Sequence, residues 1–206
     1  MLFRSQSFWP SGFPGSLDTN MYTFDPAKAK ALLAEAGFPN GFEISMDARN
    51  SAPHTNIAQA IQASMAQGGI KMTIIPAEEK AVLTKYRARQ HQMLLIDWGP
   101  DYMDPHTNAD SFARNPDNSD APKSKPLAWR NAWDIPELTK KADAAVLERD
   151  AKKRKTMYEE MQADFRKDSP FVMLYQQIEV AAYRSNVKDL KIGPTSDSTY
   201  MFKVSK

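Results

Sequence analysis

The sequence predicts an α/β fold with a mainly parallel sheet flanked by helices. Strand and helix patterns alternate between residues 42 and 97, in the order strand, helix, strand, helix, strand. Connections between them are short and carry Gly or Pro, and the last apolar run, residues 94–96, ends abruptly in a polar loop. This alternation is typical of parallel strands that are joined by right-handed crossovers.

A helix precedes the alternating region. Asp25 is a good N-cap, Pro26 suits the first helical position, and Gly37 suits a left-handed helix end. Residues 42–47 then alternate between apolar and polar side chains, which predicts a half-buried strand.

The next elements complete the predicted sheet. A helix is expected over residues 53–67, a strand over 70–75, a helix that starts at Pro76 and runs to about residue 90, and a strand over 91–97. The third strand leads directly into the loop of residues 98–106.

The second half of the chain is less regular. Residues 108–125 are polar and rich in Pro, so we expect a long surface loop, followed by helices over 136–147 and 150–166. Met157, Met161 and Phe165 mark the buried face of the second helix. Strands are expected over 170–175 and 178–183, and short strands and loops over 187–206.

Residues 1–22 form an irregular segment with three aromatic side chains, Phe8, Trp9 and Phe13. A separate domain rarely opens in this way. We expect these side chains to be exposed here and to pack against something outside the chain.

Composition excludes several function classes. A hydrophobic content of 42%, a charged content of 25% and a net charge of +2 indicate a globular protein and give no argument for a nucleic-acid partner. The basic run at residues 152–155 lies in a helical pattern and is expected to be a solvated helix face. The chain has no Cys, so it has no thiolate metal ligand and no thiol nucleophile.

No membrane span or export signal is expected in this chain. No stretch approaches the roughly 18 apolar residues of a membrane span, and Pro and Gly interrupt residues 1–20 before any apolar signal core could form.

The loop at residues 98–106 is the strongest candidate site. Ligands of open α/β sheets bind beyond the carboxyl ends of the strands, where Trp98 and Asp101 are expected. A carboxylate beside an indole suits a cationic group such as an ammonium. The alternative is that Trp98 lies in the core and Asp101 only caps a turn.

Two other functions remain open at this point. Asp101, Asp104 and His106 could bind a metal ion or act as acid and base in a small hydrolase, although the sequence holds no Walker loop, dinucleotide fingerprint, zinc-protease helix or nucleophile elbow. An interaction domain that binds another protein through the N-terminal aromatic side chains is the third possibility.

Three segments resemble one protein family. Residues 22–39 read YTFDPAKAKALLAEAGFP, residues 98–105 read WGPDYMDP, and MYEEMQ at 157–162 leads into DSPFVMLY at 168–175. These segments are similar, in the same order, to motifs of the family 5 extracellular solute-binding proteins. That family comprises the binding components of ABC importers for peptides, nickel chelates, oligosaccharides and opine-like compounds. Met173 departs from the family pattern, which has proline there.

The resemblance implies a fold and a site. It implies a lobe of the type II periplasmic-binding-protein fold and an incomplete two-lobe clamp, because family members are more than twice as long. Residues 1–21 would lead into the second lobe, residues 22–170 would form it, and residues 171–206 would cross back and belong to the first lobe. In peptide-binding members the aspartate at the position of Asp101 pairs with the ligand's amino group, and the tryptophan at the position of Trp98 lies beside it. Tyr102 is a further candidate ligand contact. Trp129 and Arg130 are further candidate ligand contacts, in a region that matches no family motif.

The same resemblance implies the partners. The expected ligand is a peptide or a similar small cationic solute, or alternatively an opine or an oligosaccharide. The expected protein partners are the permease subunits of the importer and the N-terminal lobe of the same protein. No cofactor, metal or enzymatic activity is expected. The expected location is the periplasm, or the cell exterior with a membrane anchor, with the export signal outside this chain.

Overall fold

The computed structural model describes residues 2–17, 19–178, 180–193 and 199–206. The chain forms two compact units. One is Tyr22–Trp98, and the other combines Met1–Met21 with Gly99–Lys206.

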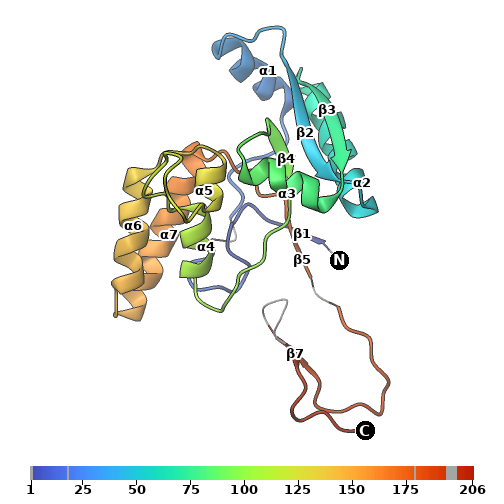
Figure 1. Ribbon diagram of the computed structural model, residues 1–206, viewed down its shortest axis with the longest axis vertical. Helices are drawn as coiled ribbons and strands as arrows, with labels where there is room; N and C mark the ends of the chain where they lie inside the picture. The colour runs from blue at the N-terminus through green and yellow to red at the C-terminus, as the bar shows by residue number, and fades with distance from the viewer. Residues whose placement is uncertain (1, 18, 179, 194–198) are drawn as a thin grey trace. The chain divides into compact units, whose positions relative to one another are not determined.

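The Tyr22–Trp98 unit is the predicted parallel α/β structure. Its elements are α1 (Pro26–Glu35), β2 (Glu43–Arg49), α2 (Ala52–Gln67), β3 (Lys71–Ala77), α3 (Glu79–Arg87) and β4 (Met93–Leu95). The three strands form one sheet in the order β3-β2-β4, and both pairings are parallel (Figure 1). The fold class expected from the sequence is therefore confirmed.

Local chemistry explains the start of α1. The Asp25 side chain accepts a hydrogen bond from the backbone N–H of Lys28 at 2.9 Å, as an N-cap does, and Pro26 takes the first helical position. Gly37 follows the helix with φ +89°, in the left-handed region.

The central strand differs from the predicted half-buried pattern. Met46, Asp47 and Ala48 are all buried, although neighbouring side chains of a strand point to opposite faces. A central parallel strand has both faces covered, so its sequence need not alternate. The buried Asp47 carboxylate is paired with Lys85 of α3 at 2.5 Å.

Pro76 does not start a helix, so that part of the prediction is wrong. It lies in β3, opposite Ala48 of β2, and α3 begins only at Glu79. β3 is an edge strand, so a backbone N–H that points away from β2 has no strand to pair with. Proline, which lacks this N–H, is therefore tolerated there. Val82 and Tyr86 of α3 are buried, as expected.

The other unit is mainly helical. It contains α4 (His106–Phe112), α5 (Leu127–Arg130), α6 (Pro136–Leu147) and α7 (Ala151–Asp168), with α6 and α7 packed side by side (Figure 1). Its strands are short: β1 (Leu2–Arg4) pairs antiparallel with β5 (Tyr175–Gln177), and β6 (Lys191–Ile192) pairs antiparallel with β7 (Thr199–Tyr200).

The N-terminal segment is part of this unit's core, which corrects the expectation that its aromatic side chains are exposed and need an outside partner. Phe8, Trp9 and Phe13 are buried, and Trp9 has no exposed surface at all. The Phe8 ring lies 4.5 Å from the Phe165 ring of α7, and the Trp9 ring lies 5.5 Å from the Tyr158 ring. Helix α7 therefore supplies the partner that the sequence pattern could not reveal.

Polar contacts hold the same segment on α7. Arg166 donates hydrogen bonds to the backbone oxygens of Gln6 and Leu17, at 3.2 and 2.8 Å, and Ser7 donates to the buried Gln162 side chain at 2.7 Å. Met161 and Phe165 are buried on this helix as predicted, and Met157 is half-buried.

Several predicted elements of the second half are wrong. The expected loop at 108–125 begins inside α4, which starts at His106 and buries Thr107, Asn108, Ala109 and Phe112. The expected strands at 170–175 and 178–183 reduce to β5, because a strand forms only where a partner lies alongside, and here that partner is the distant β1. Residue 179 and residues 194–198 lie outside the described residues. The short strands expected in the tail are present as β6 and β7.

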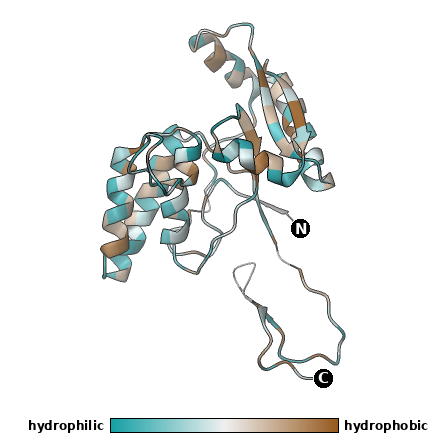
Figure 2. Cartoon of the chain, in the orientation of Figure 1, coloured by the Kyte–Doolittle hydropathy of each residue, from teal (hydrophilic) through white to brown (hydrophobic). Residues whose placement is uncertain are grey.

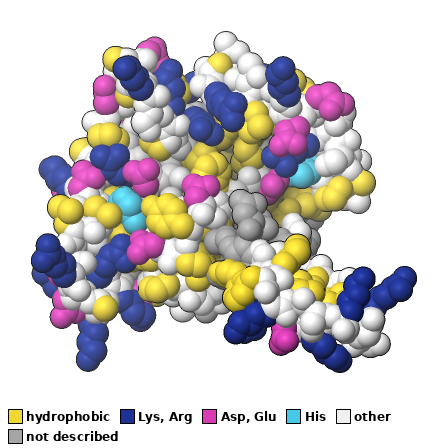
Figure 3. Space-filling model, turned by 60° about the horizontal axis from the view of Figure 1, so that its bottom comes forward, with side chains coloured by type: hydrophobic (Ala, Val, Ile, Leu, Met, Phe, Trp, Pro, Cys, Tyr) yellow, Lys and Arg dark blue, Asp and Glu magenta, His cyan; other side chains and the backbone are white. Residues whose placement is uncertain are grey.

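The surface agrees with the composition. Apolar and polar residues alternate along β2, β3 carries more apolar residues, and polar residues are interspersed along the helices (Figure 2). Lys and Arg side chains alternate with acidic ones over the face drawn in Figure 3 rather than gathering in one basic patch. Among the described residues, no helix combines the length and the apolar character needed to cross a bilayer.

Candidate functional site

The predicted site residues fall in both units. Trp98 ends the Tyr22–Trp98 unit, three residues after β4, and 41% of its surface is exposed. Asp101 and Tyr102 belong to the other unit, and both are exposed, Tyr102 to 50%. The alternative that Trp98 is a core residue is therefore wrong.

Asp101 presents its carboxylate to solvent. Its backbone N–H donates to the Thr107 hydroxyl at 3.1 Å, which fixes the residue at the start of α4. Within the described part of the chain, no hydrogen bond or ion pair occupies the carboxylate itself. The pKa of the neighbouring Tyr102 is raised, mainly by burial and then by the charges of Asp104, Asp110 and Asp101, so its hydroxyl stays protonated and can donate a hydrogen bond.

Asp104 is engaged inside the protein. Both of its carboxylate oxygens accept hydrogen bonds from the Arg154 guanidinium of α7, each at 2.8 Å. This bidentate ion pair, together with the backbone N–H of His106, holds the pKa of Asp104 below its usual value in spite of partial burial. The two carboxylates of the loop thus differ: Asp104 is paired, and Asp101 is available.

This pairing argues against a metal or acid–base site at Asp101, Asp104 and His106. Burial lowers the pKa of His106, and its Nδ1 is buried without a hydrogen-bond partner among the described residues. In the described ranges, no three His, Asp or Glu side chains lie where they could hold one metal ion. The hydrolase interpretation therefore has no geometric support.

Trp129 and Arg130 lie in α5 of the same unit as Asp101. Trp129 is buried to 2% exposure, and its indole donates to the Ser119 carbonyl at 2.6 Å. Arg130 is partly buried and donates to the Lys125 carbonyl at 3.1 Å. Both side chains thus stabilise the segment between α4 and α6, and their contact with a ligand stays a prediction.

Sequence reasoning missed a charged cluster in the Tyr22–Trp98 unit. Arg49, the last residue of β2, donates to Asp97 at 2.8 Å and lies 3.0 Å from Glu79. His54 of α2 lies 2.9 Å from the same Asp97 oxygen, and its other ring nitrogen lies 2.7 Å from the Ser51 hydroxyl.

The electrostatics of this cluster favour a charged Asp97. Burial alone would raise the pKa of Asp97, but the hydrogen bond from His54 and the positive charge of Arg49 outweigh it, so the pKa lies below its usual value. The Arg49 Nε is buried without a hydrogen-bond partner among the described residues. The rule that parallel strands end at one edge could have revealed this cluster, because Arg49 ends β2 and Asp97 follows β4.

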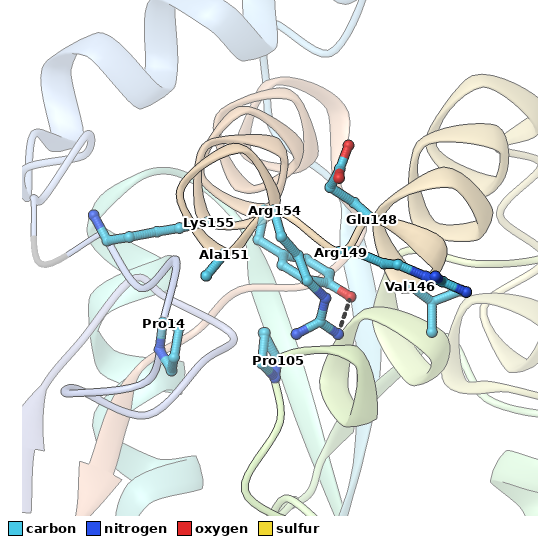
Figure 4. Close-up of a pocket in the computed structure, with 9 residues that line it drawn as sticks. Pro14, Pro105, Val146, Glu148, Arg149, Ala151, Arg154 and Lys155 are labelled. Carbon is cyan, nitrogen blue, oxygen red and sulfur yellow. Dashed lines mark hydrogen bonds between the residues drawn. The ribbon is translucent and has the colours of Figure 1, made fainter.

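A surface hollow of about 460 Å³ lies beside the Asp104–Arg154 pair (Figure 4). Its lining comprises Pro14, Pro105, Val146, Glu148, Arg149, Ala151, Arg154, Lys155 and Tyr158. The Arg154 guanidinium donates to the Tyr158 hydroxyl at 3.2 Å, whereas Figure 4 shows the Lys155 and Glu148 side chains extending in two other directions. The charged groups do not converge on a common point, so the hollow is a poor candidate for the ligand site.

Comparison with known proteins agrees with this geometry. Peptide transport periplasmic protein SapA of Salmonella typhimurium is 28% identical over 188 residues, which cover 89% of this chain and 33% of that protein. The solved structure of the ABC transporter-associated periplasmic binding protein DppA from Helicobacter pylori, in complex with peptide STSA, superposes with a TM-score of 0.75 at 26% identity. The match covers 84% of this chain and 34% of that one.

A second structure matches the fold over the whole chain. The dipeptide binding protein from Pseudoalteromonas sp. SM9913, in complex with Met-Leu, has a TM-score of 0.82 at 22% identity and covers 100% of this chain and 40% of its own. The chain thus spans about a third of the length of the curated relatives it matches.

A family model also matches more than half of the chain, over residues 3–120. Its description is bacterial extracellular solute-binding proteins, family 5 Middle, and the family is one of binding proteins rather than enzymes. The resemblance seen in the three motifs is thereby confirmed, and the chain belongs to the family 5 extracellular solute-binding proteins.

Proposed function

We propose that this chain is part of the solute-binding component of an ABC importer, which captures a peptide or a similar small cationic solute and delivers it to the permease. The relatives are periplasmic peptide-binding proteins, and we assign the chain to the same compartment or to the membrane-anchored cell exterior. The single observation that carries the proposal is the exposed Asp101 carboxylate, free of internal partners in the described chain, beside a carboxylate that is fully engaged.

The chemistry of Asp101 suits a ligand amino group. A peptide carries an ammonium at its N-terminus, and a carboxylate binds ammonium through a charge-assisted hydrogen bond. The exposed rings of Trp98 and Tyr102, close to Asp101 in sequence, supply aromatic surface for the neighbouring parts of the ligand. We keep Trp129 and Arg130 as further ligand contacts to be tested by substitution.

We further propose that the chain is the C-terminal portion of a longer two-lobe protein. Residues 1–21 lead into the second lobe, residues 22–170 belong to it, and residues 171–206 return to the first lobe. The exposed apolar side chains of the tail, among them Val180, Tyr183 and Phe202, support this assignment, because in the longer protein they gain a covering partner.

Calorimetric titration with dipeptides tests the proposal. The longer protein should bind, whereas this chain alone should give no measurable heat, because affinity in such clefts comes from closure of both lobes on the ligand. In the longer protein, Asp101→Ala should weaken binding by about 2 to 5 kcal/mol if the carboxylate pairs with a ligand charge that is buried on closure. Tight binding by this chain alone would contradict the two-lobe account.

The identity of the ligand needs a separate measurement. Mass spectrometry of compounds that copurify with the longer protein should detect peptides. Recovery of an opine or an oligosaccharide instead would replace the peptide assignment and leave the family assignment intact.

A further inference from the structure

We infer that Arg154 is a positioning residue for ligand recognition: through Asp104 it holds the loop of residues 101–105 in the form that presents the Asp101 carboxylate. This inference rests on the proposed role of Asp101 in binding the solute. It assigns a function to Arg154, one residue of the basic run at residues 152–155, which the sequence pattern indicated to be a solvated helix face.

The Arg154 side chain is itself immobilised. Its Nε donates to the Ala145 carbonyl near the end of α6 at 3.1 Å, and one of its terminal nitrogens donates to the Tyr158 hydroxyl at 3.2 Å, the contact dashed in Figure 4. The guanidinium carbon also lies 5.0 Å from the centre of the Tyr158 ring. Two helices thus fix the group before it contacts the loop.

From this fixed point Arg154 orients Asp104. Two parallel hydrogen bonds of 2.8 Å join the guanidinium to the two carboxylate oxygens, and such a fork fixes direction as well as distance. One of these oxygens also accepts the backbone N–H of His106 at 2.8 Å, and the Asp104 carbonyl accepts the backbone N–H of Thr107 at 3.1 Å. Asp104 therefore ties the first turn of α4 to α7.

The contacts then reach Asp101. The Thr107 hydroxyl, on that first turn, accepts the Asp101 backbone N–H at 3.1 Å. On the other side of Asp104, the Trp9 indole donates to the Pro105 carbonyl at 2.7 Å. Both ends of the five-residue loop are therefore bound to fixed parts of the unit, while the side chains of Asp101 and Tyr102 remain exposed.

Arg149 provides a matched control. It lines the same hollow and carries the same charge, but its side chain makes no hydrogen bond or ion pair among the described residues. A general effect of removing positive charge should appear in both Arg149→Met and Arg154→Met. An effect of positioning should appear only in Arg154→Met.

Hydrogen exchange measures the order of the loop without any ligand. In this chain, Arg154→Met should speed exchange of the hydrogen-bonded amides of Asp101, Asp104, His106 and Thr107 by about tenfold or more, with exchange in α7 and β2 unchanged. Arg154→Lys, which keeps the charge but loses the fork, should fall between the parent and Arg154→Met. Unchanged exchange in the loop, or equal acceleration throughout the unit, would overturn the inference.

Affinity measures the consequence for binding. In the longer protein, titrated with a dipeptide, Asp104→Asn and Arg154→Met should each weaken binding by about tenfold, and the double variant should be no weaker than the worse single variant. Full additivity, or undiminished affinity in both variants, would overturn the inference. If the parent binds no peptide, the proposed function fails, whereas the exchange experiment still decides whether Arg154 orders the loop.

Discussion

Trp9→Phe tests whether the N-terminal segment belongs to the core of its unit. The indole has no exposed surface, packs against Phe8 and Tyr158, and donates its N–H to the Pro105 carbonyl at 2.7 Å. Phenylalanine removes that donor, so the Pro105 carbonyl keeps only the backbone N–H of Ala109 at 3.2 Å, and it also leaves a cavity because it has one ring fewer. Together these losses should lower the free energy of unfolding by about 2 to 4 kcal/mol.

The control for this variant is the same substitution at an exposed site. Trp98→Phe, at a side chain that is 41% exposed, should change the free energy of unfolding by less than about 0.5 kcal/mol. Urea unfolding followed by circular dichroism measures both variants without relying on indole fluorescence. Equal, small shifts for the two variants would refute the placement of Trp9 in the core.

Three further predictions concern stability. Lys85→Met should destabilise the Tyr22–Trp98 unit by about 3 to 5 kcal/mol in urea unfolding, because it leaves the buried Asp47 carboxylate unpaired; an unchanged midpoint would contradict the pairing. Burial lowers the pKa of His106 in the folded protein below the ordinary value of 6.5. The neutral imidazole therefore contributes to stability above pH 6.5, and this contribution is lost as the pH falls through the lowered pKa. In thermal unfolding, His106→Gln should lessen the loss of stability between pH 7 and 5. Gly15→Ala should destabilise the protein by about 1 to 3 kcal/mol more than Gly12→Ala. Both glycines have positive φ, but only at Gly15 would a new Cβ lie 2.7 Å from a side chain of α7. Equal losses would show that α7 is not in close contact with Gly15.

The Tyr22–Trp98 unit was largely predictable because its signals are local. Asp25, Pro26 and Gly37 mark the ends of α1 by their own backbone chemistry, and the apolar runs mark the strands. The error at Pro76 arose because proline suits a helix start and an edge strand equally well, and only the strand order decides between them.

The other unit was less predictable because distant segments build it. The burial of Trp9 depends on α7, about 150 residues away, and the strand at β5 depends on pairing with β1. No local pattern records such contacts, so an aromatic side chain that is buried by a distant helix appears in the sequence as one that lacks a partner.

The candidate site was predictable in part. Its location followed from the strand-end rule and from the family motif, which pointed to Trp98 and Asp101. The difference between the paired Asp104 carboxylate and the unpaired Asp101 carboxylate did not follow from the sequence, because two aspartates in one loop look equivalent until the position of Arg154 is known. Arg49 was missed because its importance lies in ending beside Asp97, on a different strand.

The most direct test of the central claim compares two ligands on two proteins. The longer protein and its Asp101→Asn variant are titrated calorimetrically with a dipeptide and with the same dipeptide acetylated at its N-terminus, which removes the ammonium. If Asp101 binds the ligand's amino group, the parent should prefer the free dipeptide by about 2 to 5 kcal/mol, and Asp101→Asn should lose most of that preference. A variant that binds both ligands as the parent does would contradict the assignment of Asp101 as the residue that recognises the solute.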